Sequence, residues 1–180
     1  MMKIQENISL AQYTTFKIGG PARFFCEAES EKEILEALKF AQGKSLPVFV
    51  LGGGSNVLVS DKGFDGLVIK IKNSKLKIKN FTMECGAGCQ LSKIVSESVK
   101  ADLTGLEWAA GIPGTIGGAV RGNAGAFGSS MGEIIESVKV MDVSALATGS
   151  FSRQGGIRTT LCVGFLFYGR KDSRLRFSGN

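Results

Sequence analysis

The sequence predicts an α+β protein made of two α/β lobes, and three observations support this fold class. Apolar positions follow a strand, helix, strand order between residues 23 and 51, and a hairpin followed by a helix comes after residue 75. The hydrophobic fraction of 43% over 180 residues is enough for a packed core. We therefore expect a first lobe at residues 1–72 and a second lobe at residues 73–143.

The first lobe is predicted from a change in the spacing of apolar residues, from that of a strand to that of a helix. Ser30 and Glu33 make a capping-box signature, and apolar residues then recur at helical spacing until Gly43 ends the helix. The apolar run before the first glycine cluster is typical of a strand buried on both faces. We expect strands at residues 23–28, 48–51, 57–59 and 67–71, after an extended segment at residues 13–18.

The second lobe begins with a predicted hairpin. Polar and apolar residues alternate over two short segments within residues 76–85, and an amphipathic helix follows from Leu91. Apolar positions between residues 134 and 140 fit either a helix or a strand.

The formal net charge of +6 comes mainly from the end of the chain. Residues 144–180 hold six basic side chains and only one acidic side chain, Asp172. Elsewhere, lysines alternate with other residues and are predicted to form the solvated face of strands. These lysines are Lys70, Lys72, Lys75, Lys77 and Lys79. Because no aromatic residues are interleaved with the basic ones, we do not expect nucleic-acid binding.

The four cysteines and the absence of histidine limit the chemistry. Cys85 and Cys89 form a CxxxC pair, but no second pair or histidine completes a zinc site, so we expect buried or idle thiols. Ser/His and Cys/His catalysis are excluded. No apolar run reaches the length of a membrane helix, and the start of the chain lacks the apolar block of a signal peptide. We expect a cytoplasmic protein without a membrane partner.

Three consecutive glycines follow the predicted strand at residues 48–51. Ligands of open α/β sheets bind at this end of a strand, and glycine allows backbone N–H groups to approach a phosphate closely. The segment either binds phosphate or is a tight connection between strands. It contains no lysine, so anion binding would depend on backbone dipoles. Its residues are Gly52, Gly53, Gly54, Ser55 and Asn56.

Two common phosphate loops do not fit the chain. Val57 stands where the Rossmann pattern needs its third glycine. Asn123 stands where a P-loop built on Gly117 and Gly122 needs lysine. A phosphate site would therefore need another fold.

Residues 111–128 form a second region, with seven glycines in eighteen residues. It is too apolar for a disordered loop and too rich in glycine for a stable helix. It either passes close to a buried cofactor or packs tightly between a sheet and a helix. The presence of two glycine regions in one short chain favours the cofactor.

Three ordered segments resemble the signatures of the UDP-N-acetylenolpyruvoylglucosamine reductase family. They are YTTFKIGGPA at 13–22, LGGGSNVLVSDKGFDGLVI at 51–69 and GLEWAAGIPGTIGGAVRGNAGAFG at 105–128. The resemblance implies a two-lobed FAD-binding fold of the vanillyl-alcohol-oxidase (PCMH) type, with FAD between the lobes. It covers about residues 3–143, so the family's C-terminal substrate domain is expected to be absent. Without a histidine to tether it, FAD is expected to be bound non-covalently.

The resemblance also implies which residues bind FAD. The pyrophosphate would be wrapped by Gly52, Gly53, Gly54, Ser55, Asn56 and Val57. The second motif would line the pyrophosphate, ribose or adenine through Gly111, Ile112, Pro113, Gly114, Thr115, Gly117, Gly118 and Ala119. Nearer the flavin ring would lie Asn123, Gly125 and Ala126. Thr15, Gly19 and Gly20 either touch the cofactor or shape its pocket, and Trp108 either fills the core or lies beside adenine.

In this family, NADPH reduces FAD, and the reduced flavin passes hydride to the enolpyruvyl group of a UDP-sugar substrate in peptidoglycan synthesis. A serine protonates the adjacent carbon, and an arginine in an FxYRxS-like stretch and a glutamate polarise the substrate. Residues 165–173 read FLFYGRKDS, in which Arg170 is the nearest match although the spacing departs from the pattern. No catalytic residue is therefore assigned, and nothing in the sequence indicates an oligomeric state.

Three functions remain open. By ancestry the chain is an NADPH-dependent flavin oxidoreductase of the peptidoglycan pathway. The alternatives are a catalytically inactive FAD-binding fragment and another flavin oxidoreductase of the same fold. The missing serine, glutamate and substrate domain favour the fragment as a description of this polypeptide, and the motif at residues 111–128 disfavours the other oxidoreductase.

Residues 144–180 differ in composition from the rest and are predicted to be an aberrant or incomplete tail. They hold five of the seven arginines but one lysine, and hydrophobic periodicity is lost after Val143. Our hypothesis is that this segment is translated out of frame or is otherwise foreign. We expect limited proteolysis, followed by mass spectrometry, to show first cleavage between residues 145 and 155. A tail that survives the digestion would contradict the hypothesis.

Overall fold

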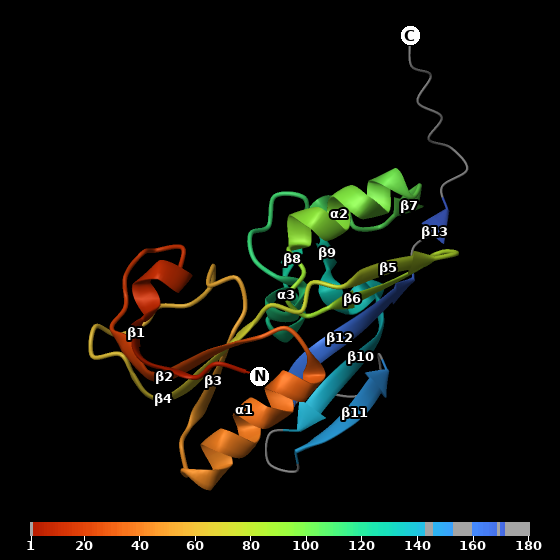
Figure 1. Ribbon diagram of the computed structural model, residues 1–180. Helices are drawn as coiled ribbons and strands as arrows, with labels where there is room; N and C mark the ends of the chain where they lie inside the picture. Colours follow the sequence, from red (N-terminus) through yellow and green to blue (C-terminus); the bar gives the residue numbers. More distant parts are fainter. Residues whose placement is uncertain (1, 143–145, 153–159, 169, 172–180) are drawn as a thin grey trace.

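The computed structural model describes residues 2–142, 146–152, 160–168 and 170–171. It contains two main sheets with helices packed beside them (Figure 1). This confirms the predicted α+β class, while the lobe limits at residues 72 and 143 stay predictions. Within the described part of the chain, no helix is long and apolar enough to cross a membrane.

The first sheet has four strands in the order β1, β2, β4, β3. Strands β2, β4 and β3 are parallel, and β1 pairs antiparallel with β2. The strands are β1 (Gln5–Ser9), β2 (Pro21–Ala28), β3 (Val48–Leu51) and β4 (Phe64–Ile71). A short 3-10 helix, η1 (Leu10–Tyr13), follows β1.

Helix α1 (Glu31–Gly43) connects β2 to β3. The predicted cap is confirmed, because the Glu33 backbone N–H donates to Ser30 Oγ at 3.3 Å. The parallel strands β2, β3 and β4 end at the same edge of the sheet, and the register there pairs Leu51 with Lys70. The first glycine cluster therefore begins at the carboxyl edge of the sheet, one residue after this pair.

The second sheet is antiparallel, with strand order β11, β10, β12, β6, β5. Its strands are β5 (Leu76–Lys79), β6 (Thr82–Gly86), β10 (Ile135–Asp142), β11 (Ala147–Ser152) and β12 (Thr160–Tyr168). The remaining elements are α2 (Leu91–Lys100), β7 (Leu103–Thr104), η2 (Glu107–Ala109), α3 (Ile116–Arg121), β8 (Gly125–Ala126), β9 (Ser129–Ser130), α4 (Met131–Ile134) and β13 (Arg170–Lys171).

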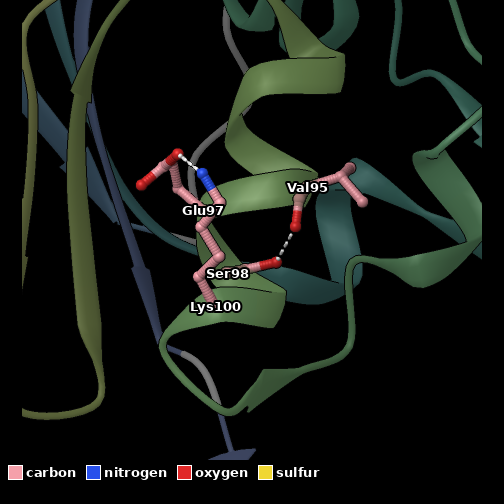
Figure 2. A network of polar contacts seen from close by, with 4 residues as sticks. All are labelled: Val95, Glu97, Ser98 and Lys100. Atoms are coloured by element: carbon pink, nitrogen blue, oxygen red, sulfur yellow. Dashed lines mark hydrogen bonds and ion pairs between the residues drawn. The ribbon is translucent and has the colours of Figure 1, made fainter.

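Helix α2 follows the hairpin as predicted, with Leu91, Ile94 and Val95 buried. Its last turn is tied by two local contacts (Figure 2). Ser98 Oγ donates to the Val95 carbonyl at 2.8 Å, and Lys100 Nζ lies 2.8 Å from Glu97 Oε1. The buried serine hydroxyl is thus satisfied within its own helix.

One hydrophobic core extends through both lobes. It joins Ile34 and Leu38 of α1, Leu67 and Ile69 of β4, and many residues of the second lobe, including Ile94 and Ile116. A smaller cluster on the other face of the first sheet contains Leu10, Ala22, Phe25, Leu51 and Val68. Strand β4 is apolar on both faces because each face packs against one of these clusters.

Two local expectations were wrong. Residues 57–59 form no strand, and the apolar side chains of Val57 and Val59 instead pack against the smaller cluster. Residues 116–121 form helix α3 despite their glycines. The N–H groups of Ile116 and Gly117 donate to the carbonyls of Cys89 and Ala87, both at 2.9 Å, and these tertiary bonds offset the weak helix propensity of glycine.

Strands also lie in the segment after Val143. Strand β12 lies between β10 and β6, and β11 pairs with the other side of β10. A strand paired on both sides can carry a continuous apolar run, so the missing alternation did not exclude sheet structure. The hypothesis that this segment is foreign stays a prediction.

Candidate functional site

The three segments that carry the sequence motifs meet at the end of β3. The Thr15 N–H donates to the Gly54 carbonyl at 3.0 Å, which ties the N-terminal segment to the first glycine loop. On the other side of this loop, Ser55 Oγ donates to the Pro113 carbonyl at 3.1 Å. Residues far apart in sequence are therefore in direct contact.

The two glycine regions touch through their backbones. A Cβ atom on Gly53 would lie 2.6 Å from Gly114 Cα, which is closer than two carbon atoms can approach. Gly54 has a φ of +74°, and a Cβ there would collide with the Tyr13 carbonyl oxygen. Glycine is required at these positions by contact and by backbone conformation.

An unpaired hydroxyl lies where the loops meet. Thr115 is 4% exposed, and its Oγ1 is buried without a hydrogen-bond partner in the described structure. A Cβ on Gly52 would lie 2.5 Å from this oxygen, so the hydroxyl packs directly against the Gly52 backbone and only glycine fits there. Because buried hydroxyls normally have a partner, this oxygen is a candidate donor to a ligand group.

The first loop also offers free backbone donors. Among the described residues, no acceptor is found for the backbone N–H groups of residues 52–56. Successive N–H groups beside a glycine-lined space form a nest for an anion. The combination of these donors with the Thr115 hydroxyl suits phosphate oxygens.

Lys70 was predicted to lie on a solvated strand face, and that prediction was wrong. Its side chain is half-buried, and its Nζ donates to the Gly52 carbonyl. Nζ also lies 5.9 Å from the centre of the Tyr13 ring. Burial lowers the pKa of Lys70 and repulsion from Lys72 adds to this, while Glu27 opposes it. The loop therefore has a lysine beside it, although none lies within it.

One sequence signal could have identified Lys70. It interrupts the apolar run at residues 67–71, where a buried strand normally has no charge. Its position next to the loop follows from its pairing with Leu51, which the sequence alone does not reveal.

Several other predicted FAD ligands make packing contacts in the structure. Gly117 packs against Ala87, whose carbonyl would lie 2.8 Å from a Cβ on Gly117. Ala119 is buried in the main core, and Ile112 packs against it. Asn56 and Gly111 are exposed, and Gly118 lies next to Thr115 Oγ1. Their roles in cofactor binding stay predictions.

The residues predicted near the flavin ring lie in and beside a small hairpin. Gly125 and Ala126 pair with Ser130 and Ser129. Asn123 Oδ1 accepts from the Gly132 N–H at 2.9 Å, so this side-chain oxygen supports the local loop.

The other residues singled out by sequence have structural contacts. Gly19, with a φ of +134°, and Gly20 pack against Val59 and the Asp61 carbonyl. Trp108 packs against the main core, and its Nε1 donates to the Gly105 carbonyl at 3.0 Å.

Arg170 and the cysteines are the last of the residues that the sequence analysis considered. The backbone of Arg170 pairs with Thr104 in a two-stranded ladder, and its side chain lies outside the described residues. Cys26, Cys85 and Cys89 are buried free thiols, as expected.

Comparison with known proteins agrees with this geometry. The family described as FAD binding domain matches residues 22–150. UDP-N-acetylenolpyruvoylglucosamine reductase from Clostridium novyi (strain NT) is 40% identical over 141 residues, covering 78% of this chain and 46% of that protein. The enzyme of the same name from Parasynechococcus marenigrum (strain WH8102) is 41% identical over 142 residues, covering 77% and 48%. The chain spans about half the length of these relatives.

Solved structures give the same fold. The UDP-N-acetylenolpyruvylglucosamine reductase of Thermus caldophilus matches with a TM-score of 0.77 and 30% identity, covering 94% of this chain and 62% of that chain. The Physcomitrella patens protein BBE-like 1 matches with a TM-score of 0.70 and 15% identity, covering 94% and 42%. These likenesses confirm the predicted FAD-binding fold class.

The contact between Gly53 and Gly114 predicts the effect of a single methyl group. We expect Gly53→Ala to lower the free energy of unfolding by about 1–3 kcal/mol, because the added carbon forces the two loops apart. Urea unfolding followed by circular dichroism measures this. Gly43→Ala is the control, since a Cβ there meets nothing within 4 Å. Equal stability of the two variants would show that the loops separate without cost.

Proposed function

Because this chain belongs to the FAD binding domain family and carries the FAD-binding portion of a UDP-N-acetylenolpyruvoylglucosamine reductase, we propose that it binds FAD non-covalently between its two glycine regions. The observation that carries this proposal is the buried, unpaired Thr115 Oγ1, which packs against Gly52 where the two glycine regions meet. An FAD pyrophosphate has the acceptor oxygens that this hydroxyl and the N–H groups of residues 52–56 lack.

The chain's own residues fit this cofactor. Gly52 and Gly53 leave the backbone partly exposed, and Ser55 holds the Pro113 carbonyl and so fixes the distance between the loops. Gly114 lies against Ser55 Oγ, and Gly118 lies near Thr115 Oγ1. The site supplies neutral donors and close backbone approach, and the charge beside it comes from Lys70.

The proposed reaction is that of the full-length relatives. Bound FAD would carry hydride from NADPH to the enolpyruvyl group of a UDP-sugar, giving UDP-N-acetylmuramate for peptidoglycan synthesis in the cytoplasm. Through the cell wall this reaction supports cell shape and cell division. The alternative is a catalytically inactive FAD-binding fragment, because the chain spans about half the length of its curated relatives and none of its residues is assigned a catalytic role.

A spectroscopic experiment tests both proposals. We expect the purified protein, after incubation with FAD and gel filtration, to retain flavin absorbance in the visible range. Anaerobic addition of NADPH then separates them: bleaching supports the reductase, and unchanged absorbance supports the binding fragment. A protein that retains no flavin and shows no FAD binding in an equilibrium titration would overturn the proposed cofactor.

Removal of the Thr115 hydroxyl should affect the two states in opposite ways. We expect Thr115→Val to weaken FAD binding about tenfold, because the cofactor loses a buried hydrogen bond. The ligand-free protein should be as stable as before or more stable, since an unpaired buried oxygen is removed. FAD titration and urea unfolding measure the two effects, with Thr82→Val in β6 as the control. Unchanged FAD affinity would show that Thr115 does not contact the cofactor.

A further inference from the structure

Lys70 has a position that the proposed FAD contacts do not explain. It lies at the end of β4, on the face that carries Val68 and faces the smaller apolar cluster. A half-buried ammonium in such surroundings is costly unless it is bonded. Its Nζ donates to the Gly52 carbonyl and lies near the Tyr13 ring.

The bond to Gly52 fixes the orientation of a peptide unit. The peptide bonds of the described chain are all trans, so the carbonyl of Gly52 and the N–H of Gly53 point in opposite directions. Because the carbonyl points to Lys70, the Gly53 N–H points away from it. That N–H has no acceptor among the residues that the structure describes.

A glycine pair needs such a constraint. Two adjacent glycines allow the peptide between them to rotate at little steric cost. A rotated peptide would direct the Gly52 carbonyl oxygen, which carries partial negative charge, at a bound phosphate. The loop would then repel the anion that it otherwise binds.

From these contacts we infer that Lys70 is a positioning residue: it holds the Gly52 carbonyl so that the Gly53 N–H faces the FAD pyrophosphate. This inference rests on the proposed FAD binding. Lys70 acts through the peptide and need not contact the cofactor.

Binding measurements on four proteins test the inference. We expect Lys70→Met to weaken the binding of FAD, and equally of ADP, by about tenfold or more, because both ligands share the pyrophosphate. Lys70→Arg, which keeps a charged donor, should recover much of the affinity. Lys72→Met is the matched control, since Lys72 is exposed and pairs with Glu27 at 3.7 Å without a contact to Gly52. Its affinities should stay within about twofold of the wild type.

A second measurement separates peptide orientation from a general effect on folding. In ¹H–¹⁵N spectra of the ligand-free protein, the Gly53 amide signal should shift in Lys70→Met and stay in place in Lys72→Met. Circular dichroism checks that each variant is folded, and Lys70→Gln replaces Lys70→Met if the latter does not fold.

The outcomes are distinguishable. If the wild type binds FAD and Lys70→Met binds it equally well, the positioning role is wrong and the proposed cofactor stands. An unmoved Gly53 signal together with weaker binding would also overturn the positioning role, because Lys70 would then act by charge alone. If the wild type binds no FAD, the proposed function and this inference both fail.

Discussion

A carbon atom added to Gly53 would lie 2.6 Å from the Cα of Gly114, so the loop after β3 and the loop before α3 are in direct backbone contact. The first loop is held at the carboxyl edge of a parallel sheet by β3 and by the Thr15 bond to Gly54. The second is held by the bonds from Ile116 and Gly117 to the segment before α2. Since each loop is fixed by its own lobe, the contact between the loops depends on how the lobes pack.

Apolar burial holds the lobes together. The main core contains α1 and one face of β4 from the first lobe and residues of α2, α3 and β10 from the second. Figure 1 shows α1 lying between the strands of the two sheets. The ion pair between Glu31 and Lys139, at 2.7 Å, also joins the lobes, but both side chains are more than 40% exposed. Such a pair contributes about 0–1 kcal/mol, so the shared core has the larger effect.

The sequence pattern correctly predicted those helices and strands whose signals come from neighbouring residues. The capped, periodic helix α1 and the apolar strand β3 lie where the sequence places them, because their signals come from neighbouring residues. Helix α3 and the position of Lys70 depend on partners far along the chain. The glycines at 117 and 118 have low helix propensity, and the helix forms because the carbonyls of Cys89 and Ala87 accept hydrogen bonds from its first turn. The sequence around Lys70 is typical of an exposed strand face. Its position beside Gly52 follows from the strand register, which pairs it with Leu51.

The same limit applies to the candidate site. Glycine content predicted close approach of the backbone in both regions, and it left two interpretations open, cofactor binding and tight packing. Gly117 packs against the Ala87 carbonyl, whose acceptor is already used, whereas Gly52 packs against the unpaired Thr115 hydroxyl. The atoms around each glycine are needed to choose between these interpretations, because the residue type alone is the same in both cases.

The unpaired Thr115 hydroxyl lowers the stability of this junction, and the proposed FAD binding would account for its presence. A buried hydroxyl without a partner costs about 1–3 kcal/mol, which a valine at the same position would avoid. The free N–H groups of residues 52–56 and the bond from Lys70 to the Gly52 carbonyl are likewise present without a ligand. A pyrophosphate that binds there needs little rearrangement of the protein, so more of its interaction energy appears as affinity. The features that make this junction less stable as a core are therefore the ones that make it suitable as a binding site.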